Sequence, residues 1–304
     1  LRMDYYLGID GGGTKTAFEC YTESNELVAK IVQPTCHLLQ VSEDMAGMIL
    51  SDGIAQIQEL IDFKAEDDGL YVCYGLAGYG LNSDLKSRIE TVCQESSQGL
   101  PYIVCNDAEV ALEGALAGKD GVLLIAGTGS ISLAKCGPQI RRCGGWGYQV
   151  GDEGSSYWLG KELVREFTRQ SDHRSNRTLL YSYLKKKFDL NQDGDLIQVL
   201  AKDYQDRQAW ASLAQDTSYL VDQGDPAAQG ILKVAADHLA DLVSVYRSDF
   251  PQEAKIVYIG GLLSHSDQLR NYLAERLPDT YTLMPPLGSP AYGASQLARR
   301  YIKS

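Results

Sequence analysis

Hydrophobic residues in the first 118 positions follow two spacings that alternate along the chain. Short apolar or alternating runs, typical of strands, are separated by segments with the three-to-four-residue spacing of helices that bury one face. Ser42 and Ser83 precede two of the helical segments and are the expected N-caps. The pattern predicts an α/β fold with some antiparallel hairpins, with strands at 5–10, 15–21, 25–34, 69–80 and 101–107 and helices at 42–61, 83–96 and 108–118.

The pattern after residue 145 is mostly helical. One further strand is predicted at 254–264, and two more helices follow it. No low-complexity segment or linker divides the chain. The helices before that strand are predicted at 155–170, 178–188, 195–202, 210–223 and 225–250.

A glycine-rich turn between two strands occurs twice. Residues 121–136 repeat the pattern of residues 5–21, and an offset of 116 positions superimposes them. The repeat predicts two related domains, each contributing one hairpin to a shared site. We place these domains at 1–113 and 114–289, with the C-terminal helix at 290–304 packing back on the first. The offset aligns Gly11 with Gly127, Gly13 with Gly129, Thr14 with Ser130 and Thr16 with Ser132.

The composition excludes some classes of function. A net charge of −12 leaves no extended basic surface for nucleic acid, although backbone amides and a metal ion could still hold a nucleotide. The seven cysteines are scattered and no C-x-x-C motif occurs, which is typical of a reducing compartment. No apolar run is long enough to cross a bilayer, and no signal peptide is evident. We therefore expect a cytoplasmic protein that binds neither nucleic acid nor membrane.

The two glycine-rich turns are candidates for phosphate binding. Glycines allow backbone N–H groups to point at a ligand, and Thr and Ser hydroxyls add donors. Strands flank both turns, whereas the usual phosphate loops run from a strand into a helix. Either turn alone is equally well explained as a tight β-turn. Two matched turns favour a clamp that holds a triphosphate from both sides.

Two carboxylates close predicted strands near these motifs. Asp10 precedes the first glycines, where it could hold Mg²⁺, directly or through water, or accept hydrogen bonds in an Asx-turn. Asp107 ends the strand at 101–107, where it could act as the general base of phosphoryl transfer or cap the next helix. The sequence leaves both pairs of alternatives open.

A third glycine-rich segment, at 143–162, surrounds Trp146, Asp152 and Glu153. An aromatic ring can cover the apolar face or the acyl group of a sugar, and carboxylates can accept hydrogen bonds from its hydroxyls. The alternative is a flexible loop whose polar residues cap the helix at 155–170. The five glycines beside a tryptophan favour the sugar site.

Six motifs in chain order resemble the N-acetylglucosamine kinase family, and the resemblance spans essentially the whole chain. The segment at 144–160 is the most specific of the six. The family belongs to the sugar-kinase/actin/heat-shock-chaperone ATPase superfamily, in its branch with the benzoyl-CoA-reductase-type activating ATPases. The resemblance implies two ribonuclease-H-like (actin-like ATPase) domains with a cleft between them, ATP and Mg²⁺ as cofactors, and a homodimer. The motifs are GIDGGGTKT (8–16), CNDAEVAL (105–112), LLIAGTGSI (123–131), GGWGYQVGDEGSSYWLG (144–160), YIGGLLS (258–264) and GSPAYGASQLA (288–298).

The resemblance also implies roles for single residues. Asp107 takes the place of the catalytic base, and Asp10 falls in the first phosphate loop. Lys15 adds a positive charge to that loop or is simply solvated. The implied sets are Gly12, Gly13, Thr14 and Lys15 for the first phosphate loop; Gly127, Thr128, Gly129 and Ser130 for the second; Gly260, Gly261 and Ser264 for adenosine; and Asn106, Asp107, Gly145, Trp146, Gly147 and Asp152 for the sugar.

The chain departs from the family pattern at one position. The segment at 33–41 has Cys36 where the family commonly has an asparagine that contacts the sugar. A thiol is a poor donor and a weak acceptor, so this contact is weakened or is replaced by the neighbouring His37.

The predicted function is transfer of the γ-phosphoryl group of ATP to the 6-hydroxyl of N-acetylglucosamine, or of glucosamine or N-acetylmuramic acid. The alternative is an ATPase activator of a redox enzyme, with an iron–sulfur cluster at a dimer interface, for which Cys136 and Cys143 would be the nearest candidates. A sugar-sensing regulator is a third hypothesis, but we find no helix-turn-helix pattern ahead of the first strand.

Overall fold

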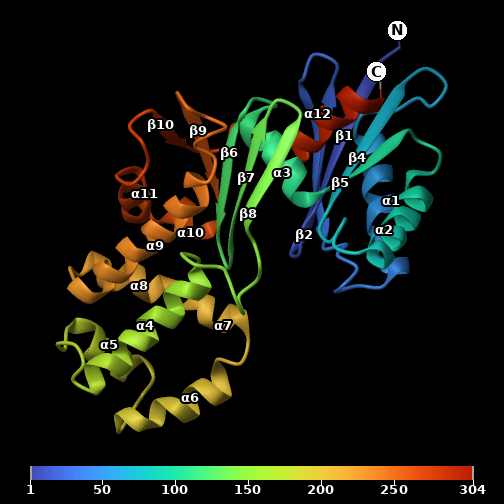
Figure 1. The fold of residues 1–304 in the computed structure, drawn as a ribbon. Helices are drawn as coiled ribbons and strands as arrows, with labels where there is room; N and C mark the ends of the chain where they lie inside the picture. Colours follow the sequence, from blue (N-terminus) through green and yellow to red (C-terminus); the bar gives the residue numbers. More distant parts are fainter. Residues whose placement is uncertain (1, 303–304) are drawn as a thin grey trace. The chain divides into compact units, whose positions relative to one another are not determined.

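The structure, a computed structural model, describes residues 2–302 and divides into two compact units (Figure 1). The first unit consists of Leu1–Lys119 with Pro286–Ser304, and the second of Asp120–Pro285. The expected boundary near residue 113 falls inside helix α3 (Asp107–Leu116), which belongs to the first unit. Each unit is built on its own five-stranded sheet.

The sheet of the first unit has the strand order β3-β2-β1-β4-β5. Its first three strands form an antiparallel meander, and β4 and β5 continue the sheet parallel to β1. All five strands predicted in this half are confirmed. Their bounds are β1 (Asp4–Gly11), β2 (Lys15–Thr22), β3 (Leu27–Pro34), β4 (Gly69–Leu76) and β5 (Tyr102–Asn106).

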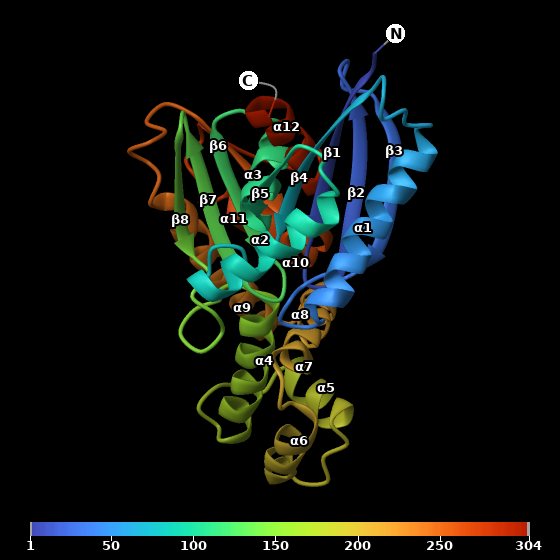
Figure 2. The ribbon, with the colours of Figure 1, turned by 90° about the vertical axis from the view of Figure 1, so that its right-hand side faces the viewer.

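Helices cover both faces of this sheet. Helices α1 (Glu43–Leu60) and α2 (Ser83–Ser97) share a buried core with one face, whereas α3 and α12 (Pro290–Ile302) pack against the other (Figure 2). Ser42 caps α1, as predicted, because its hydroxyl accepts a hydrogen bond from the N–H of Met45. The predicted cap of α2 is wrong: the carboxamide of Asn82 accepts from the N–H of Leu85, so Ser83 already lies inside the helix.

The sheet of the second unit has the order β10-β9-β6-β7-β8. It consists of an antiparallel meander, β6 to β8, extended by β9 and β10 parallel to β6. This is the arrangement of the first sheet with each strand replaced by its counterpart. The offset of 116 residues therefore reflects a shared topology. The bounds are β6 (Gly121–Ala126), β7 (Ser130–Cys136), β8 (Gln139–Gly144), β9 (Ala254–Ile259) and β10 (Tyr281–Met284).

Three elements of the second unit were not predicted. Strands β8 and β10 lie at the two edges of the sheet, where β8 is largely exposed and β10 has only four residues. Edge strands need not be buried, so they leave little hydrophobic pattern. The strand predicted at 254–264 ends at Ile259, and the short helix α10 (Gly261–His265) follows it.

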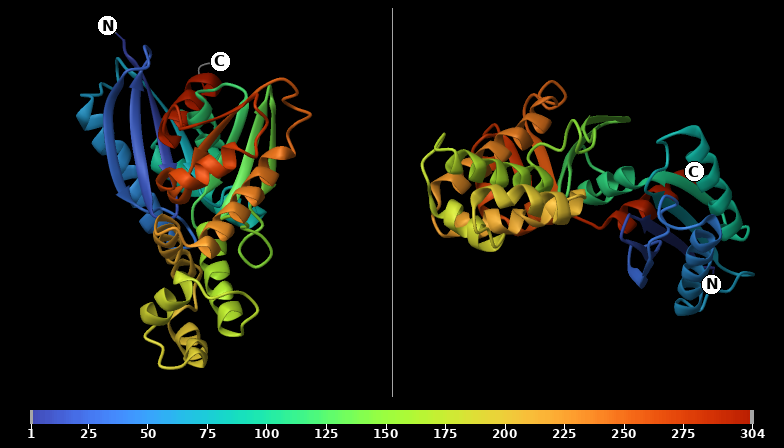
Figure 3. Two further views of the ribbon diagram at one scale, coloured as in Figure 1. Left: turned by 90° about the vertical axis from the view of Figure 1, so that its left-hand side faces the viewer. Right: turned by 90° about the horizontal axis from the view of Figure 1, so that it is seen from below.

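Helices α4, α8 and α11 pack against α9, which contacts β6, β7 and β8, and helices α5 and α7 pack against α4 (Figures 1 and 3). The helix predicted at 210–223 is in fact two helices that join at Leu213, and the helix predicted at 225–250 ends at Ser244. Within residues 2–302, no helix combines the length and apolar character needed to cross a membrane. The bounds are α4 (Ser156–Ser171), α5 (Leu179–Lys187), α6 (Leu196–Asp203), α7 (Arg207–Ser212), α8 (Ala214–Asp222), α9 (Pro226–Ser244) and α11 (Asp267–Ala274).

Candidate functional site

The parallel strands of the first unit bring Asp10 and Asp107 to the same edge of the sheet. Gly11 of β1 lies opposite Leu76 of β4, and Leu76 lies opposite Asn106 of β5. The two strand ends are therefore about 10 Å apart, which is two interstrand spacings. The carboxyl ends of parallel strands are where open α/β sheets bind their ligands. Pairing along the sheet thus unites two carboxylates that lie far apart in the sequence.

Both carboxylates are shifted towards their protonated forms. Burial raises the pKa of Asp10 to about 6, and the nearby charge of Asp107 adds to the rise, while Lys15 opposes it. Burial also raises the pKa of Asp107, while backbone N–H groups at the start of α3 and the side chain of His37 lower it. A raised pKa from burial and a like charge in one place is typical of a functional site.

Asn106 caps helix α3, so Asp107 is not needed for this purpose. The Asn106 side chain accepts a hydrogen bond from the N–H of Ala108 at 2.9 Å and donates one to the carbonyl of Tyr79 at 2.8 Å. The capping interpretation of Asp107 is therefore wrong, because Asp107 is the first residue of the helix and its predecessor is the cap. Asn106 positions the start of α3 and hence the base candidate.

The first glycine-rich turn is tight and its tip is exposed. The N–H of Gly12 donates to the carbonyl of Lys15 at 3.1 Å, and the hydroxyl of Thr35 donates to the carbonyl of Gly12 at 2.8 Å. Gly13, Thr14 and Lys15 are exposed at the end of this turn. The backbone carbonyls are thus bonded inward, and the tip presents a hydroxyl and an ammonium group to a ligand.

Cys36 and His37 follow β3 beside this turn. The Cys36 side chain is only 5% exposed, and a Cβ added at Gly11 would lie 2.8 Å from its sulfur. Burial raises the pKa of the Cys36 thiol, which keeps it neutral. Nδ1 of His37 accepts a hydrogen bond from the N–H of Leu39, which leaves Nε2 for an outside partner. In this structure the thiol serves packing, and His37 is the more accessible of the two polar side chains.

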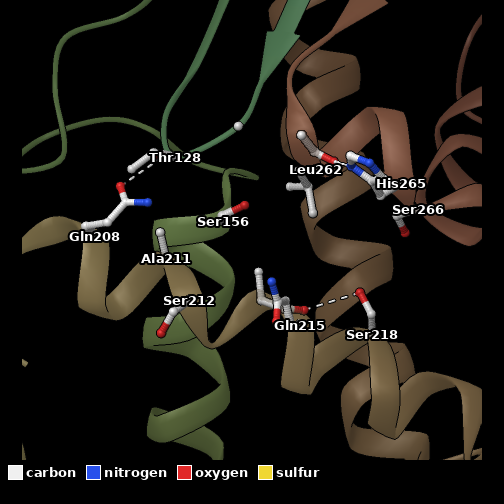
Figure 4. A pocket seen from close by; sticks show the side chains of 13 residues that line it. Thr128, Ser156, Gln208, Ala211, Ser212, Gln215, Ser218, Leu262, His265 and Ser266 are labelled. Carbon is white, nitrogen blue, oxygen red and sulfur yellow. Dashed lines mark hydrogen bonds between the residues drawn. The ribbon is translucent and has the colours of Figure 1, made fainter. Parts of the chain in front are cut away.

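The second unit contains a cavity of about 410 Å³ beside the second glycine-rich turn (Figure 4). Its size is within the range of small-molecule sites. Gly127, Thr128 and Gly261 are the predicted residues that line it. The side chains from α7 and α8 were missed, because no motif marks small polar residues on one helix face as ligand contacts. The remaining lining residues are Ser156, Gln208, Ala211, Ser212, Ala214, Gln215, Ser218, Leu262, His265 and Ser266.

The turn after β9 closes tightly on the second glycine-rich turn. Gly260 has φ of 100°, in the region that favours glycine, and a Cβ there would lie 2.4 Å from the carbonyl oxygen of Ala126. Gly261 opens helix α10 next to it and lines the cavity. The close approach of these two backbones therefore requires glycine at position 260, and its contact with adenosine stays a prediction.

In the second glycine-rich turn, Ser130 forms hydrogen bonds with the segment at 152–153. The N–H of Ser130 donates to Asp152 Oδ1 at 3.2 Å, and its hydroxyl donates to the carbonyl of Glu153 at 2.7 Å. Both donors are thus engaged within the unit, and Ser130 holds the loop rather than presenting a free donor. Thr128 lies at the cavity instead, where its hydroxyl contacts the side chain of Gln208.

The glycine-rich segment at 144–154 displays Trp146 at the surface. Its side chain is 77% exposed, and the guanidinium of Arg142 lies 5.7 Å from the centre of the ring. Arg142 also donates to the carbonyls of Gly144 and Gly145. An exposed aromatic ring that a neighbouring cation and backbone hold in place is suited to cover a sugar face.

Asp152 lies at the end of the same segment but is almost fully buried. Its second oxygen, Oδ2, accepts a hydrogen bond from Arg207 Nη2 at 2.6 Å. The predicted contact of Asp152 with the sugar stays a prediction, because both oxygens already have partners. Arg207 lies 55 positions away in the sequence and was not predicted.

Comparisons with known proteins agree with this architecture. Residues 7–298 match the model of the BadF/BadG/BcrA/BcrD ATPase family. The chain is 31% identical to the N-acetyl-D-glucosamine kinase of Dictyostelium discoideum over 98% of both chains. It is 28% identical to the N-acetylmuramic acid/N-acetylglucosamine kinase of Clostridium acetobutylicum, over 98% of this chain and 99% of that one.

A solved structure confirms the fold. A candidate N-acetylglucosamine kinase from Chromobacterium violaceum superimposes with a TM-score of 0.68, covering 97% of this chain and 98% of that chain at 24% identity. The predicted α/β fold with two related domains is therefore confirmed.

Proposed function

Because the chain belongs to the BadF/BadG/BcrA/BcrD ATPase family, we propose that it is an ATP-dependent amino-sugar kinase. It transfers the γ-phosphoryl group to the 6-hydroxyl of N-acetylglucosamine or a close relative, such as glucosamine or N-acetylmuramic acid. The observation that carries the proposal is the pair of carboxylates, Asp10 and Asp107, at the carboxyl edge of the first sheet. Relatives that are themselves sugar kinases support it.

Asp107 is the proposed general base. Burial raises its pKa above that of an exposed aspartate, which makes the carboxylate a better proton acceptor. The sugar oxygen forms a bond to the γ-phosphorus, the bond from that phosphorus to the bridging oxygen of ADP breaks, and the hydroxyl proton passes to the Asp107 carboxylate. Asn106 holds the base in place by capping α3.

Mg²⁺ belongs to the proposal, and the residues fit it. Neighbouring carboxylates are the hard oxygen ligands that this ion prefers. The raised pKa of Asp10 means that the protein's own cations compensate its charge only in part, and a bound cation would complete the compensation. Asp10 would hold the ion, directly or through water, and the ion would supply charge neutralisation on the phosphates.

The cavity of the second unit is the proposed adenosine site. Gly127, Thr128 and Gly261 all line it, which supports the motif match to an adenosine-binding turn. The polar side chains of its lining are neutral amides, hydroxyls and one histidine. Neutral donors and acceptors suit a nucleobase and its ribose, whereas the phosphates need the glycine-rich turns. Gln208 and Gln215 are the proposed contacts to the nucleoside.

The proposed sugar contacts come from the glycine-rich segment that carries Trp146 and from the segment that follows β3. Trp146 covers the sugar, with Gly145 and Gly147 allowing backbone approach, and His37 takes over the polar contact that Cys36 does not make. The protein acts as a homodimer in the cytoplasm in this proposal, as the family resemblance implies.

The decisive experiment is ADP release from Mg-ATP with N-acetylglucosamine, glucosamine, N-acetylmuramic acid, N-acetylmannosamine, glucose and a blank without sugar. Strong turnover with one amino sugar and a low blank is expected. Hydrolysis that does not depend on sugar would overturn the proposal and favour the ATPase activator. The activator has less support, since the matched relatives named above are kinases. An iron assay of the purified dimer separates the two.

A further inference from the structure

Arg207 lies where three parts of the second unit meet. It is the first residue of α7, and its guanidinium donates to Asp152 Oδ2 at 2.6 Å. The ring of Tyr148, from the glycine-rich segment that carries Trp146, lies 5.9 Å away. The next residue, Gln208, contacts the hydroxyl of Thr128. The start of α7 therefore contacts both the proposed sugar segment and the second phosphate loop.

The contact with the phosphate loop is unusually close. A Cβ added at Gly129 would lie 2.0 Å from Arg207 Nη2 and 2.7 Å from Asp152 Oδ1. A side chain there would displace the Arg207 guanidinium, the end of a flexible side chain, and would press on the buried Asp152 carboxylate. The N–H of Ser130, the next residue of the loop, donates to the same Asp152 oxygen. Arg207, Asp152 and the loop thus form one connected group.

The ion pair is asymmetric in its exposure. The side chain of Asp152 is 3% exposed, and that of Arg207 is 36% exposed. Asp152 also has φ of 65°, in the left-handed region that non-glycine residues seldom occupy. The Arg207 Nε is buried and has no hydrogen-bond partner among the described residues. The position of the guanidinium is therefore set by Asp152 and the loop, and it does not satisfy all of its own donors.

A buried carboxylate without its cation is strongly disfavoured. Loss of Arg207 would leave the Asp152 carboxylate buried and unpaired, which favours its movement away from this position. Such a movement would also break the hydrogen bond from the N–H of Ser130 and change the packing over Gly129. The effect would reach both the phosphate loop and the segment of Trp146 at once.

We propose that Arg207 is a positioning residue for phosphoryl transfer, which holds the Asp152 carboxylate and the second phosphate loop in one arrangement. The proposal rests on the proposed kinase function. Arg207 acts through Asp152 and the loop, and it couples the binding of the two substrates.

The test compares Arg207→Ala, Arg207→Lys and Arg207→Gln with Arg300→Ala as the matched control. Arg300 pairs with the buried Glu113 in the first unit. The Arg300 side chain is 44% exposed and that of Glu113 is 5% exposed, and neither residue belongs to a proposed substrate site. We expect Arg207→Ala to lower kcat about 100-fold and Arg207→Lys about tenfold, as small displacements of reacting groups do. Added ethylguanidinium should restore part of the activity of Arg207→Ala only. Arg300→Ala should lower the melting temperature and leave kcat and both KM values within threefold of wild type.

Two further readouts separate positioning from a merely structural role. In Arg207→Gln, which keeps N–H donors but loses the positive charge, the KM for the sugar should rise at a fixed pH of 8, because the buried Asp152 carboxylate is no longer paired with a cation. Calorimetric titration of each folded variant with Mg-ADP should show about tenfold weaker binding in Arg207→Ala. Unchanged kcat, KM and Mg-ADP affinity in folded Arg207→Lys and Arg207→Ala would overturn the proposal, as would an equal loss in Arg300→Ala.

The two proposals fail in different ways. Absence of sugar-dependent ADP release from wild type contradicts the kinase function before any variant is compared. The Mg-ADP titration still decides whether Arg207 fixes the second phosphate loop: a loss confined to Arg207 variants supports it, and equal affinities overturn it.

Discussion

The two hairpins that the offset of 116 residues relates share a framework but differ in chemistry. Thr16 and Ser132 are matched positions, and both hydroxyls are fully buried. Thr16 donates to the carbonyl of Pro34 and accepts from the N–H of Cys36, whereas Ser132 donates to the carbonyl of Leu242 and also contacts Tyr246. In both units this hydroxyl links its hairpin to a neighbouring segment through hydrogen bonds, so the two units share this interaction as well as their strand order.

The residues at the turns have diverged. The first hairpin has Asp10 before its glycines, and the matched position of the second has Ala126, which is fully buried. The charged groups beside the second turn come from other segments of the same unit, where Asp152 and Arg207 form an ion pair. The first unit therefore contains two ionisable carboxylates at one sheet edge, and the second contains a cavity without acidic side chains and a paired Asp152. The two units share their strand order and differ in the side chains around their turns.

The largest effect is expected from a substitution in the pair of carboxylates, Asp10 and Asp107. Asp107→Asn removes the proposed base while keeping its shape, and turnover should fall about 10³-fold, within the range for general bases. Sugar affinity, measured by calorimetry, should stay within about tenfold of wild type, since the amide still forms a hydrogen bond. Near-normal turnover in this variant would show that another group takes the proton.

A pH titration of stability tests the pKa of Asp10. The folded pKa of about 6 exceeds the ordinary aspartate value of 3.8, so the folded state binds more protons between these values. The contribution of Asp10 is therefore fully present below pH 3.8 and is lost as the pH rises through about 6. The loss is of the order of 2–3 kcal/mol.

Asp10→Asn is the control for this titration. Urea unfolding at pH 4 to 7 should show the decline in wild type and less of it in Asp10→Asn, and Mg²⁺ should reduce it in wild type only. A decline of equal size in the variant would assign the titration to another carboxylate.

Removal of one cavity amide should have a smaller effect. Gln215→Ala should raise the KM for ATP about tenfold, the value of one or two lost hydrogen bonds in a site. The KM for the sugar and the melting temperature should stay close to those of wild type, because Gln215 is exposed on the cavity wall. An increase in the sugar KM instead would place the sugar, and not adenosine, in this cavity.

The smallest effect tests the shared framework. Thr16→Ala and Ser132→Ala should each lower the free energy of unfolding by about 1–3 kcal/mol, because each leaves buried polar groups without a partner. Similar losses in the two variants would support equal roles for the two hydroxyls. A lower free energy of unfolding in one variant alone would show that the two matched hydroxyls contribute differently to stability.

Much of the fold follows from local patterns that the sequence displays directly. The five strands of the first sheet, the cap at Ser42 and the repeat of the hairpin were predicted from hydrophobic spacing and turn residues. These features depend on residues within a few positions of one another. The edge strands β8 and β10 and the break at Leu213 were missed, because exposed strands and a bend between helices leave no such spacing.

The sequence by itself determined which residues are candidates for the chemistry: two carboxylates, two glycine-rich turns and a tryptophan in a glycine-rich segment. Only the tertiary structure decided which of them meet. Asp10 and Asp107 interact because parallel pairing aligns β1, β4 and β5, and Asp152 meets Arg207 because α7 begins beside the second glycine-rich turn. The structure also showed that Asn106, and not Asp107, caps α3, and that the Cys36 side chain is buried. Contacts between distant residues arise from sheet register and helix packing, which depend on the whole buried core and not on any local spacing.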